Sequence, residues 1–530
     1  MKKTIFLCLL ITLSIVNSQT NLSLASDTPL IISDNSGVYV SGNFISIGTT
    51  TIESKSDSFG ALIVKGNVSN GNTIYYKRYV DSYVNALSTG VWDLISAPLQ
   101  NSSINSFVTD NTGDIATAAI NNGVTHYALR DYDHVNDIWV NHTSASVPSA
   151  GNFDLGMGHQ MASVHGNTLT FEGLVPLADQ TQSIVNDYVS SVISPRGQWN
   201  LIGNPFPSYL NVNISADAAN NFLSLNSGVI DANFLCVYKK RADGSSYDIY
   251  NNTSGHAYIN PGEGFWVAAS RSTPANIVFT EAMQTFDFGD NSTVFDPNDT
   301  SSEFYLKLYE GQNYLKADTK FYFDEDLNYE LDPGYDAGAF NQSMELMSSL
   351  PTDDQGIGMS INAVSSDIFN TTDGIPLIVN RPANIPFRLS LEDSNLDPDV
   401  DVYLYDKQQG TYTDLSFQDF TLTPTSNLSG KGRFYVVFSP TSLGVNDLDN
   451  NLDISIYKAF DQNQINIEGL ANVRIANVQL YNIIGQEVLN KRLSANKFKH
   501  SVSTIGLKTG IYILKLEADT SIITKKLIIN

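Results

Sequence analysis

The chain has 530 residues, of which 42% are hydrophobic and 16% are charged, so it is long enough for several globular domains. Its 30 basic and 55 acidic residues give a net charge of −25, which excludes a nucleic-acid-binding protein that depends on a basic face. Two cysteines exclude a disulfide scaffold, and 36 glycines with 26 Phe and 26 Tyr favour strands joined by tight turns.

Residues 1–18 have the pattern of a secretory signal peptide. Two lysines precede an apolar run over 4–16 that is too short to span a membrane, and small residues then predict cleavage between Ser18 and Gln19. A lipoprotein signal at Cys8 is the alternative, disfavoured because only seven residues precede that cysteine. No later stretch reaches 18 apolar residues, so we expect an exported chain without a transmembrane anchor.

The segment 19–89 is expected to form a small N-terminal β segment. Between residues 30 and 66, short runs of β-forming residues alternate with glycine, asparagine or serine. Such short, regularly spaced strands are typical of rungs in a solenoid-like cap.

The next two hundred residues contain an internal repeat. Trp92-Asp93-Leu94-Ile95 recurs as Trp199-Asn200-Leu201-Ile202, the Gly-x-Gly at 156–158 recurs at 262–264, and 167–173 recurs as 276–282. All three landmarks are displaced by 106 to 109 residues, which predicts two copies of one β-module over about 90–175 and 197–283. We assign them to domains 90–196 and 197–300.

Each copy is expected to contain a strand, a short helix, a hairpin and two further strands. In the second copy, Ser215 is a plausible N-cap for a helix over 216–225. Asp243-Gly244 indicates the tight turn of the hairpin that joins 234–240 to 247–250. Strand-like residues follow each Gly-x-Gly, so these glycines predict a turn into a strand and not a phosphate-binding loop.

The tryptophans and the cysteine of this region are expected to serve the core. Trp92, Trp199 and Trp266 fall at repeat landmarks, so we expect them in the core. Trp139 lies beside an acidic turn; its ring is expected either to be buried or to form an exposed surface that binds a sugar. Cys236 lies in an apolar strand-like run and is expected to be a buried structural thiol.

Residues 301–445 read as a further β-sandwich with one candidate metal site. Asp324, Asp326, Asp332 and Asp336 lie in one acidic stretch, and oxygen-rich loops suit calcium. The spacing fits no twelve-residue calcium loop, so a solvated acidic turn is the favoured alternative and no cofactor is predicted with certainty.

The last eighty residues differ in charge from the rest. Residues 451–530 contain ten Lys or Arg and six Asp or Glu, in contrast to the strongly acidic body. This break predicts a separate module over 446–530, built as a small antiparallel sandwich.

The motifs of this module are a strand, a glycine turn and a strand over 478–488, then Gly510-Ile511-Tyr512, then Lys525-Lys526 before the final residues. The module is similar to the C-terminal sorting domain of proteins that the type IX secretion system of Bacteroidota exports. Its sorting-motif residues would be Gly485, Gly510, Tyr512, Lys525 and Lys526. Relatives carry Tyr-Pro-Asn-Pro where 457–460 reads Tyr-Lys-Ala-Phe, which weakens the domain boundary.

The resemblance implies that the secretion machinery is the partner, that the tail is removed, and that the chain is released or attached at the cell surface. The alternative is an ordinary terminal β-domain. The body, over roughly 60–440, resembles uncharacterised surface β-sandwich proteins that carry the same tail; the similarity lies in 199–207 and 259–267.

The sequence shows no catalytic signature. The seven histidines form no His-Glu-x-x-His pattern, and no Gly-x-Ser-x-Gly occurs, although carboxylate pairs of a glycosidase are defined only in space. We therefore expect an all-β chain of several sandwich domains in tandem, with an Ig-like sorting domain, secreted or displayed at the cell surface. Non-catalytic adhesion, glycan contact or a surface-layer role is expected; the alternatives are a secreted carbohydrate-active or proteolytic hydrolase and a purely structural envelope protein.

Overall fold

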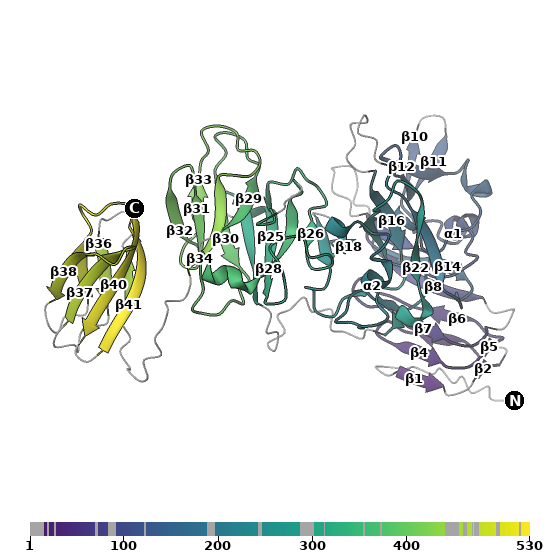
Figure 1. Cartoon of the computed structure of the whole chain (residues 1–530). Coiled ribbons are helices and arrows are strands. Elements are labelled where there is room, and N and C mark those ends of the chain that lie inside the picture. The colour runs from purple at the N-terminus through teal and green to yellow at the C-terminus, as the bar shows by residue number, and fades with distance from the viewer. Residues whose placement is uncertain are drawn as a thin grey trace. The chain divides into compact units, whose positions relative to one another are not determined.

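The structure is a computed structural model of the whole chain (Figure 1). It describes residues 15–18, 21–25, 28–68, 73–82, 92–120, 123–187, 197–241, 246–286, 302–311, 313–352, 356–371, 374–439, 455–458, 464–468, 470, 476–493, 499–518 and 521–529. The chain divides into two compact units: one holds residues 1–306 and 317–365, the other holds 307–316 and 366–530. The segment 317–365, expected in the 301–445 sandwich, therefore belongs to the first unit.

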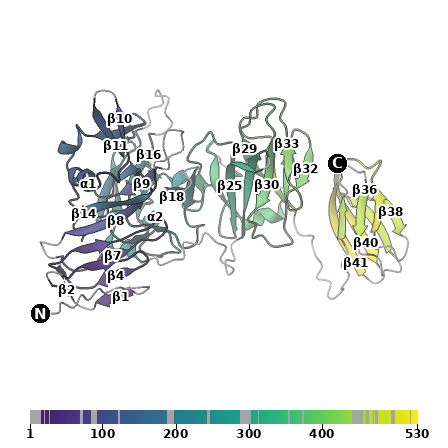
Figure 2. The same ribbon diagram turned by 180° about the vertical axis from the view of Figure 1, so that it is seen from behind.

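The first unit begins with short strands that stack in parallel, as Figure 2 shows from behind. β4 (Gly37–Val40) pairs with β1 (Ile15–Ser18) and β7 (Ala61–Val64), while β6 (Thr50–Ile52) pairs with β3 (Leu30–Ile32) and β8 (Ile74–Val80). β2 (Leu22–Leu24) pairs with β5 (Phe44–Ser46). The rungs expected between 30 and 66 are thus coils of a small parallel solenoid, and their inward side chains, such as Ile32, Ile52 and Ile74, are buried on one another.

The expected signal peptide is described only in part. Residues 1–14 and Gln19 lie outside the described residues, whereas Ile15–Ser18 form β1 on the edge of the solenoid. Cleavage after Ser18 stays a prediction, and it would remove this strand.

The two predicted copies have the same sheet. In the first, the strand order is β9 (Asp93–Ser96), β13 (Gly158–Met161), β11 (Val124–Asp133) and β12 (Ile138–Thr143), with β10 (Thr117–Ile120) also on β11. In the second, the order is β16 (Trp199–Gly203), β21 (Gly264–Ala268), β18 (Val237–Lys240) and β19 (Tyr247–Tyr250). Their registers also match: Gly158 lies opposite Ser96 in the first copy, and Gly264 lies opposite Gly203 in the second.

Each repeat starts earlier than the sequence predicted. The final strand of the first copy, β14 (Asn167–Gly173), pairs with β8, and the final strand of the second, β22 (Ala275–Phe279), pairs with β15 (Gln180–Ile184). The structural unit therefore runs from β8 to β14 and from β15 to β22. The sequence missed β8 and β15 as repeat members because their own residues show no similarity.

The Gly-x-Gly motifs lie where the two copies meet. The amide of Ser96 donates to the carbonyl of Gly262 (3.0 Å), and reciprocally the amide of Gly203 donates to the carbonyl of Gly156 (2.9 Å). The copies thus face each other about a local two-fold relationship. Gly156 and Gly262 have φ of 82° and 62°, as a turn into a strand requires.

The helices are short, and one expectation about them is wrong. α1 (Ile104–Asp110) begins after Ser103, whose side chain accepts from the Ser106 amide. α2 covers Phe222–Asn226 with Asn221 as its N-cap, and not 216–225 with Ser215. The reason is Asn213, whose side chain fixes the preceding residues by accepting from the Ala216 amide and donating to two carbonyls of a neighbouring turn.

The next strands along the chain border a long acidic turn; of their residues, 307–316 belong to the second unit. β24 (Ser302–Glu310) and β25 (Tyr314–Asp324) lead into the turn. β26 (Ala337–Gly338), β27 (Leu346–Ser348) and β28 (Met359–Ser365) follow it. β28 runs parallel to β25, with Lys320 opposite Ile361, and β26 lies on the other side of β28.

The second unit contains a sandwich and the C-terminal module. The sandwich consists of β29 (Ile375–Val379), β30 (Phe387–Glu392), β31 (Asp401–Asp406), β32 (Thr411–Asp414), β33 (Phe420–Leu422) and β34 (Phe434–Ser439). In it, β34 pairs with β29 and β31, β31 with β32, and β30 with β33.

The C-terminal module consists of two antiparallel sheets. One contains β35 (Ser455–Lys458), β36 (Gln464–Glu468) and β39 (Lys499–Ser503); the other has the order β38 (Glu487–Leu493), β37 (Ala476–Asn482), β40 (Gly510–Ala518) and β41 (Ser521–Ile529). Their facing side chains, among them Ile467, Val478, Leu514 and Leu527, make one apolar core. The prediction of an all-β chain is confirmed.

Candidate functional site

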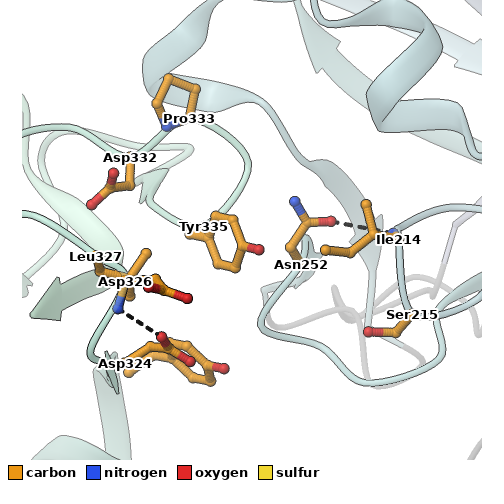
Figure 3. A pocket seen from close by; sticks show the side chains of 10 residues that line it. Ile214, Ser215, Asn252, Asp324, Asp326, Leu327, Asp332, Pro333 and Tyr335 are labelled. Atoms are coloured by element: carbon orange, nitrogen blue, oxygen red, sulfur yellow. Dashed lines mark hydrogen bonds between the residues drawn. The ribbon is translucent and has the colours of Figure 1, made fainter. Parts of the chain in front are cut away.

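A cleft of about 390 Å³ lies in the first unit, between the acidic turn and the second repeat copy (Figure 3). The turn after β25 supplies one wall, and the loop after β17 (Tyr209–Asn211) and the turn after β19 supply the other. Its lining residues are Ile214, Ser215, Asn252, Tyr322, Asp324, Asp326, Leu327, Asp332, Pro333 and Tyr335.

Asp336 lies beneath the acidic wall of the cleft and holds it by hydrogen bonds. Its side chain is fully buried, and its two oxygens accept from the amides of Asp332 and Ala363, both at 2.7 Å. These bonds tie the turn to β28. Burial raises the pKa of Asp336 to about 7, although both amide hydrogen bonds oppose the rise.

The carboxylates above Asp336 lie within the same turn. Asp324 accepts from the Asp326 amide (2.9 Å), and Asp332 accepts from the amide and side chain of Asn328 (2.7 and 2.9 Å). Backbone hydrogen bonds therefore hold these acidic side chains in place, which reduces the conformational entropy that a ligand would have to overcome.

Tyr335 projects between the two walls, as Figure 3 shows. Burial first, and then the charges of Asp324, Asp326 and Asp332, raise the pKa of its hydroxyl. The phenol thus stays protonated at neutral pH and can both donate and accept a hydrogen bond.

Asparagines fix the opposite wall to the turn. The side chain of Asn251 donates to the Tyr335 carbonyl (2.5 Å), and the Asn252 amide donates to the Gly334 carbonyl (2.8 Å). The Asn252 side chain also accepts from the Ile214 amide (3.3 Å). Because these bonds join the two walls directly, the cleft is built before any ligand arrives.

The chemistry of the cleft suits a neutral or cationic polyhydroxyl ligand. Carboxylates, a serine hydroxyl and an amide offer hydrogen bonds, and two tyrosines offer aromatic surface. None of the described residues that line it is basic, so an anionic ligand would find no counter-charge.

The sequence found part of this cleft. Asp324, Asp326 and Asp332 line it, whereas both carboxylate oxygens of Asp336 accept hydrogen bonds from backbone amides. Within the described residues no three His, Cys, Asp or Glu side chains are grouped so that they could hold a metal ion, and the calcium site considered from the sequence stays a prediction. The sequence missed Tyr335 and Asn252; the pattern Tyr335-Asp336 beside the acidic run was the only available signal for the former.

A second polar cluster, which the sequence did not predict, lies in the first copy. Asp131 on β11 accepts from His159 Nδ1 (2.7 Å) on β13 and from His142 Nε2 (3.1 Å) on β12. Burial by itself raises the pKa of Asp131, but the two histidine hydrogen bonds outweigh it and hold that pKa well below its ordinary value. The cluster joins three strands and opens into no described cavity, so we interpret it as structural.

The four tryptophans mostly pack against other side chains. Trp199 and Trp266 are buried, and half-buried Trp139 packs on Trp266 with ring centroids 6.0 Å apart. Trp92 is half-buried, with the Arg130 guanidinium 3.9 Å from its ring centroid. Cys236 is buried and free.

The sorting-motif residues occupy structural positions of the C-terminal module. Gly485, with a φ of 78°, makes the turn between β37 and β38, and Gly510 begins β40. Tyr512 is buried and donates to the Lys508 carbonyl (2.8 Å). Lys525 and Lys526 lie on β41, the last strand.

Comparison with known families also separates the body of the chain from the C-terminal module. Residues 448–530 match the family described as a secretion system C-terminal sorting domain. The chain is therefore a cargo of the type IX secretion system, secreted or displayed at the outer surface. Residues 8–438 match a domain of unknown function (DUF8693), and the chain belongs to that family.

Comparison with solved structures gives only distant likenesses. Dimeric latent PorU from Porphyromonas gingivalis is 10% identical with a TM-score of 0.13; the match covers 48% of this chain and 31% of PorU, so the chain spans about a third of that protein. The BSP domain of a biofilm-associated protein is 9% identical with a TM-score of 0.15, and the match covers 86% of this chain and 96% of that domain. No curated protein matches the chain. Among the described residues, no helix has the length and apolar character to cross a membrane.

Proposed function

We propose that the protein is a non-catalytic, surface-exposed glycan-binding protein that uses the cleft between the acidic turn and the second repeat copy. The observation that carries the proposal is the cleft itself: about 390 Å³, lined by two tyrosines, three carboxylates, Ser215 and Asn252. Pockets of this size hold one or two sugar rings, whose C–H faces pack on aromatic rings and whose hydroxyls donate to carboxylates.

A binding role fits the carboxylates better than a catalytic one. Asp336, whose pKa burial raises to about 7, would be the natural general acid, yet both of its oxygens accept from backbone amides beneath the cleft. A hydrolase remains the competing function, and it would require a product to appear when a glycan is bound.

Glycan-array binding of the purified full chain tests the proposal. Tyr335→Ala and Asp324→Asn/Asp326→Asn should each weaken binding at least about tenfold: the first removes the ring, and the second removes both negative charges and replaces one acceptor oxygen of each carboxylate with a donor. Asp399→Asn, an exposed carboxylate in the second unit, is the matched control and should bind as the wild type does. Equal binding by all variants, or no binding to any glycan, would contradict the proposal; release of reducing sugar would favour the hydrolase.

A further inference from the structure

Exposed isoleucines gather at one end of the sorting domain. Ile483 and Ile484 are 76% and 79% exposed in the turn between β37 and β38, and Ile505 is 79% exposed between β39 and β40. The other exposed large hydrophobic residue of the domain's described part, Ile513, is only 43% exposed. Together Ile483, Ile484 and Ile505 are here called the apolar tip.

Strand register places both turns at the same end of the sandwich. Asn482, just before the first turn, lies opposite Tyr512, just after the start of β40. The second turn leads from Ser503 directly into β40. The C-terminal end of β41 lies there too, because Ile529 pairs with Gly510.

The chain enters the domain at the opposite end. Ser455, the first residue of β35, pairs with Glu468, which in turn pairs with Lys499 at the start of β39. β39 then runs the length of the sheet before it reaches the apolar tip. The first described residue of the domain therefore lies at the end opposite the apolar tip.

Local structure does not explain these isoleucines. Gly485 and Gly506, with φ of 78° and 93°, supply the conformations that the two turns require. The other turn positions favour Asn, Asp, Ser or Gly, and an exposed isoleucine gains nothing there from burial. Asn482 accepts from the amides of Ile484 and Gln486 (3.2 and 3.0 Å), so the first turn is held in one shape with its apolar side chains outward.

We propose that the apolar tip is the contact through which the sorting domain docks on a protein of the type IX secretion machinery. The machinery is the occupant that the match to a sorting domain implies. Lys508 is exposed in the second turn and Glu487 is exposed beside the first turn, so the two charges offset each other and the docking surface on the machinery would be an apolar pocket. A preformed apolar turn entering such a pocket loses little entropy on binding.

Export of the full chain by its native host tests the proposal. The variant Ile483→Ser/Ile484→Ser/Ile505→Ser should lower the exported fraction at least about tenfold and leave tail-bearing protein in the periplasm. The matched control is Ile47→Ser/Phe417→Ser, which removes residues 73% and 87% exposed in the body and should be exported normally. Replacement of all three tip residues by leucine should restore export.

Two further measurements separate docking from folding. Thermal unfolding of the purified chain should show the sorting domain of the serine variant intact, since its substitutions are exposed. Ile484→Glu, a single exposed change, should impair export as well by placing a negative charge in the apolar pocket. Normal export of the serine variant or of Ile484→Glu would overturn the proposal. None of these readouts involves a glycan, so the outcome is independent of the proposed binding function.

Discussion

Asn111 and Asn226 make the same hydrogen bonds in the two repeat copies. Each lies at the C-terminal end of the copy's helix, and its side-chain amide donates to the carbonyl one helical turn earlier (2.7 and 2.9 Å). Each side chain also exchanges two bonds with the final strand: Asn111 with Thr170 (2.7 and 3.0 Å) and Asn226 with Val278 (2.8 and 3.0 Å). Both asparagines are buried, so the interaction fastens helix to sheet in each copy.

Loss of either asparagine should destabilise the first unit. Asn226→Ala leaves a strand amide and a carbonyl without partners in the interior, at a cost of about 2 kcal/mol in the free energy of unfolding. Asn111→Ala should cost a similar amount because its bonds are the same. Asn105→Ala, on the exposed face of α1, should change stability little. Denaturant unfolding measures all three, and an equal effect of Asn105→Ala would contradict the assignment.

The glycines between the copies should tolerate no side chain. A Cβ on Gly158 would lie 2.6 Å from the Ile202 carbonyl oxygen, and one on Gly264 would lie 2.8 Å from the Ile95 amide nitrogen. Gly158→Ala and Gly264→Ala should each lower the free energy of unfolding by about 1–3 kcal/mol, because the copies must separate.

Gly228 is the control for these substitutions. No atom lies within 4 Å of a Cβ built there, and no positive φ forbids one. Gly228→Ala should therefore be neutral or stabilise the chain by about 0.5 kcal/mol. Thermal unfolding compares the three variants; unchanged stability of Gly264→Ala would show that the interface between the copies is loose.

Asp336 should make stability fall as pH rises. Its pKa in the folded chain is about 7, raised by burial above an ordinary value of 3.8. Its stabilising contribution is therefore fully present below pH 4 and is lost as pH rises to about 7, a change on the order of 4 kcal/mol. Asp336→Asn cannot titrate, so the difference between the two unfolding free energies should vary over this range. Parallel curves from pH 4 to 8 would contradict the shift.

Asp131 should have the opposite dependence. Since the histidine hydrogen bonds lower its pKa below 3.8, its contribution is present above that pH and is lost as pH falls further. At pH 7, Asp131→Asn should cost about 2–4 kcal/mol because charge-assisted bonds are lost. The difference from wild type should shrink below pH 4 in acid unfolding; a constant difference would indicate that the carboxylate charge contributes nothing.

Cys236 should be inert in the folded chain. Burial raises the pKa of its thiol to about 12, although a hydrogen bond involving Tyr238 opposes this. Alkylation at pH 8 should be at least about a hundredfold slower than in denaturant, since the thiolate is the nucleophile. In denaturant the exported chain should carry one label, because the predicted signal peptide takes Cys8 with it. Two labels would contradict the predicted cleavage, and rapid native labelling would contradict the burial.

The sequence alone determined the strand-rich class, the duplication and the sorting tail, since each depends on the order and spacing of residues. Alternation along strands, the recurrence of Trp-x-Leu-Ile and the terminal motifs are local patterns that need no contact between distant residues. Local rules failed where two choices were equivalent: Ser215 and Asn221 can both cap a helix, and the buried contacts of Asn213 decided between them.

Only the tertiary structure decided which contacts the residues in these patterns make. The sequence identified Gly158 and Gly264 as turn residues, but their contact with the opposite copy follows from how two sheets pack. It also grouped four aspartates that have different surroundings in the fold: Asp336 is turned inward to two backbone amides, whereas the other three line a cleft together with Tyr335. A cleft forms where segments distant along the chain meet, and the free energy of packing whole sheets fixes that meeting, which no single segment encodes.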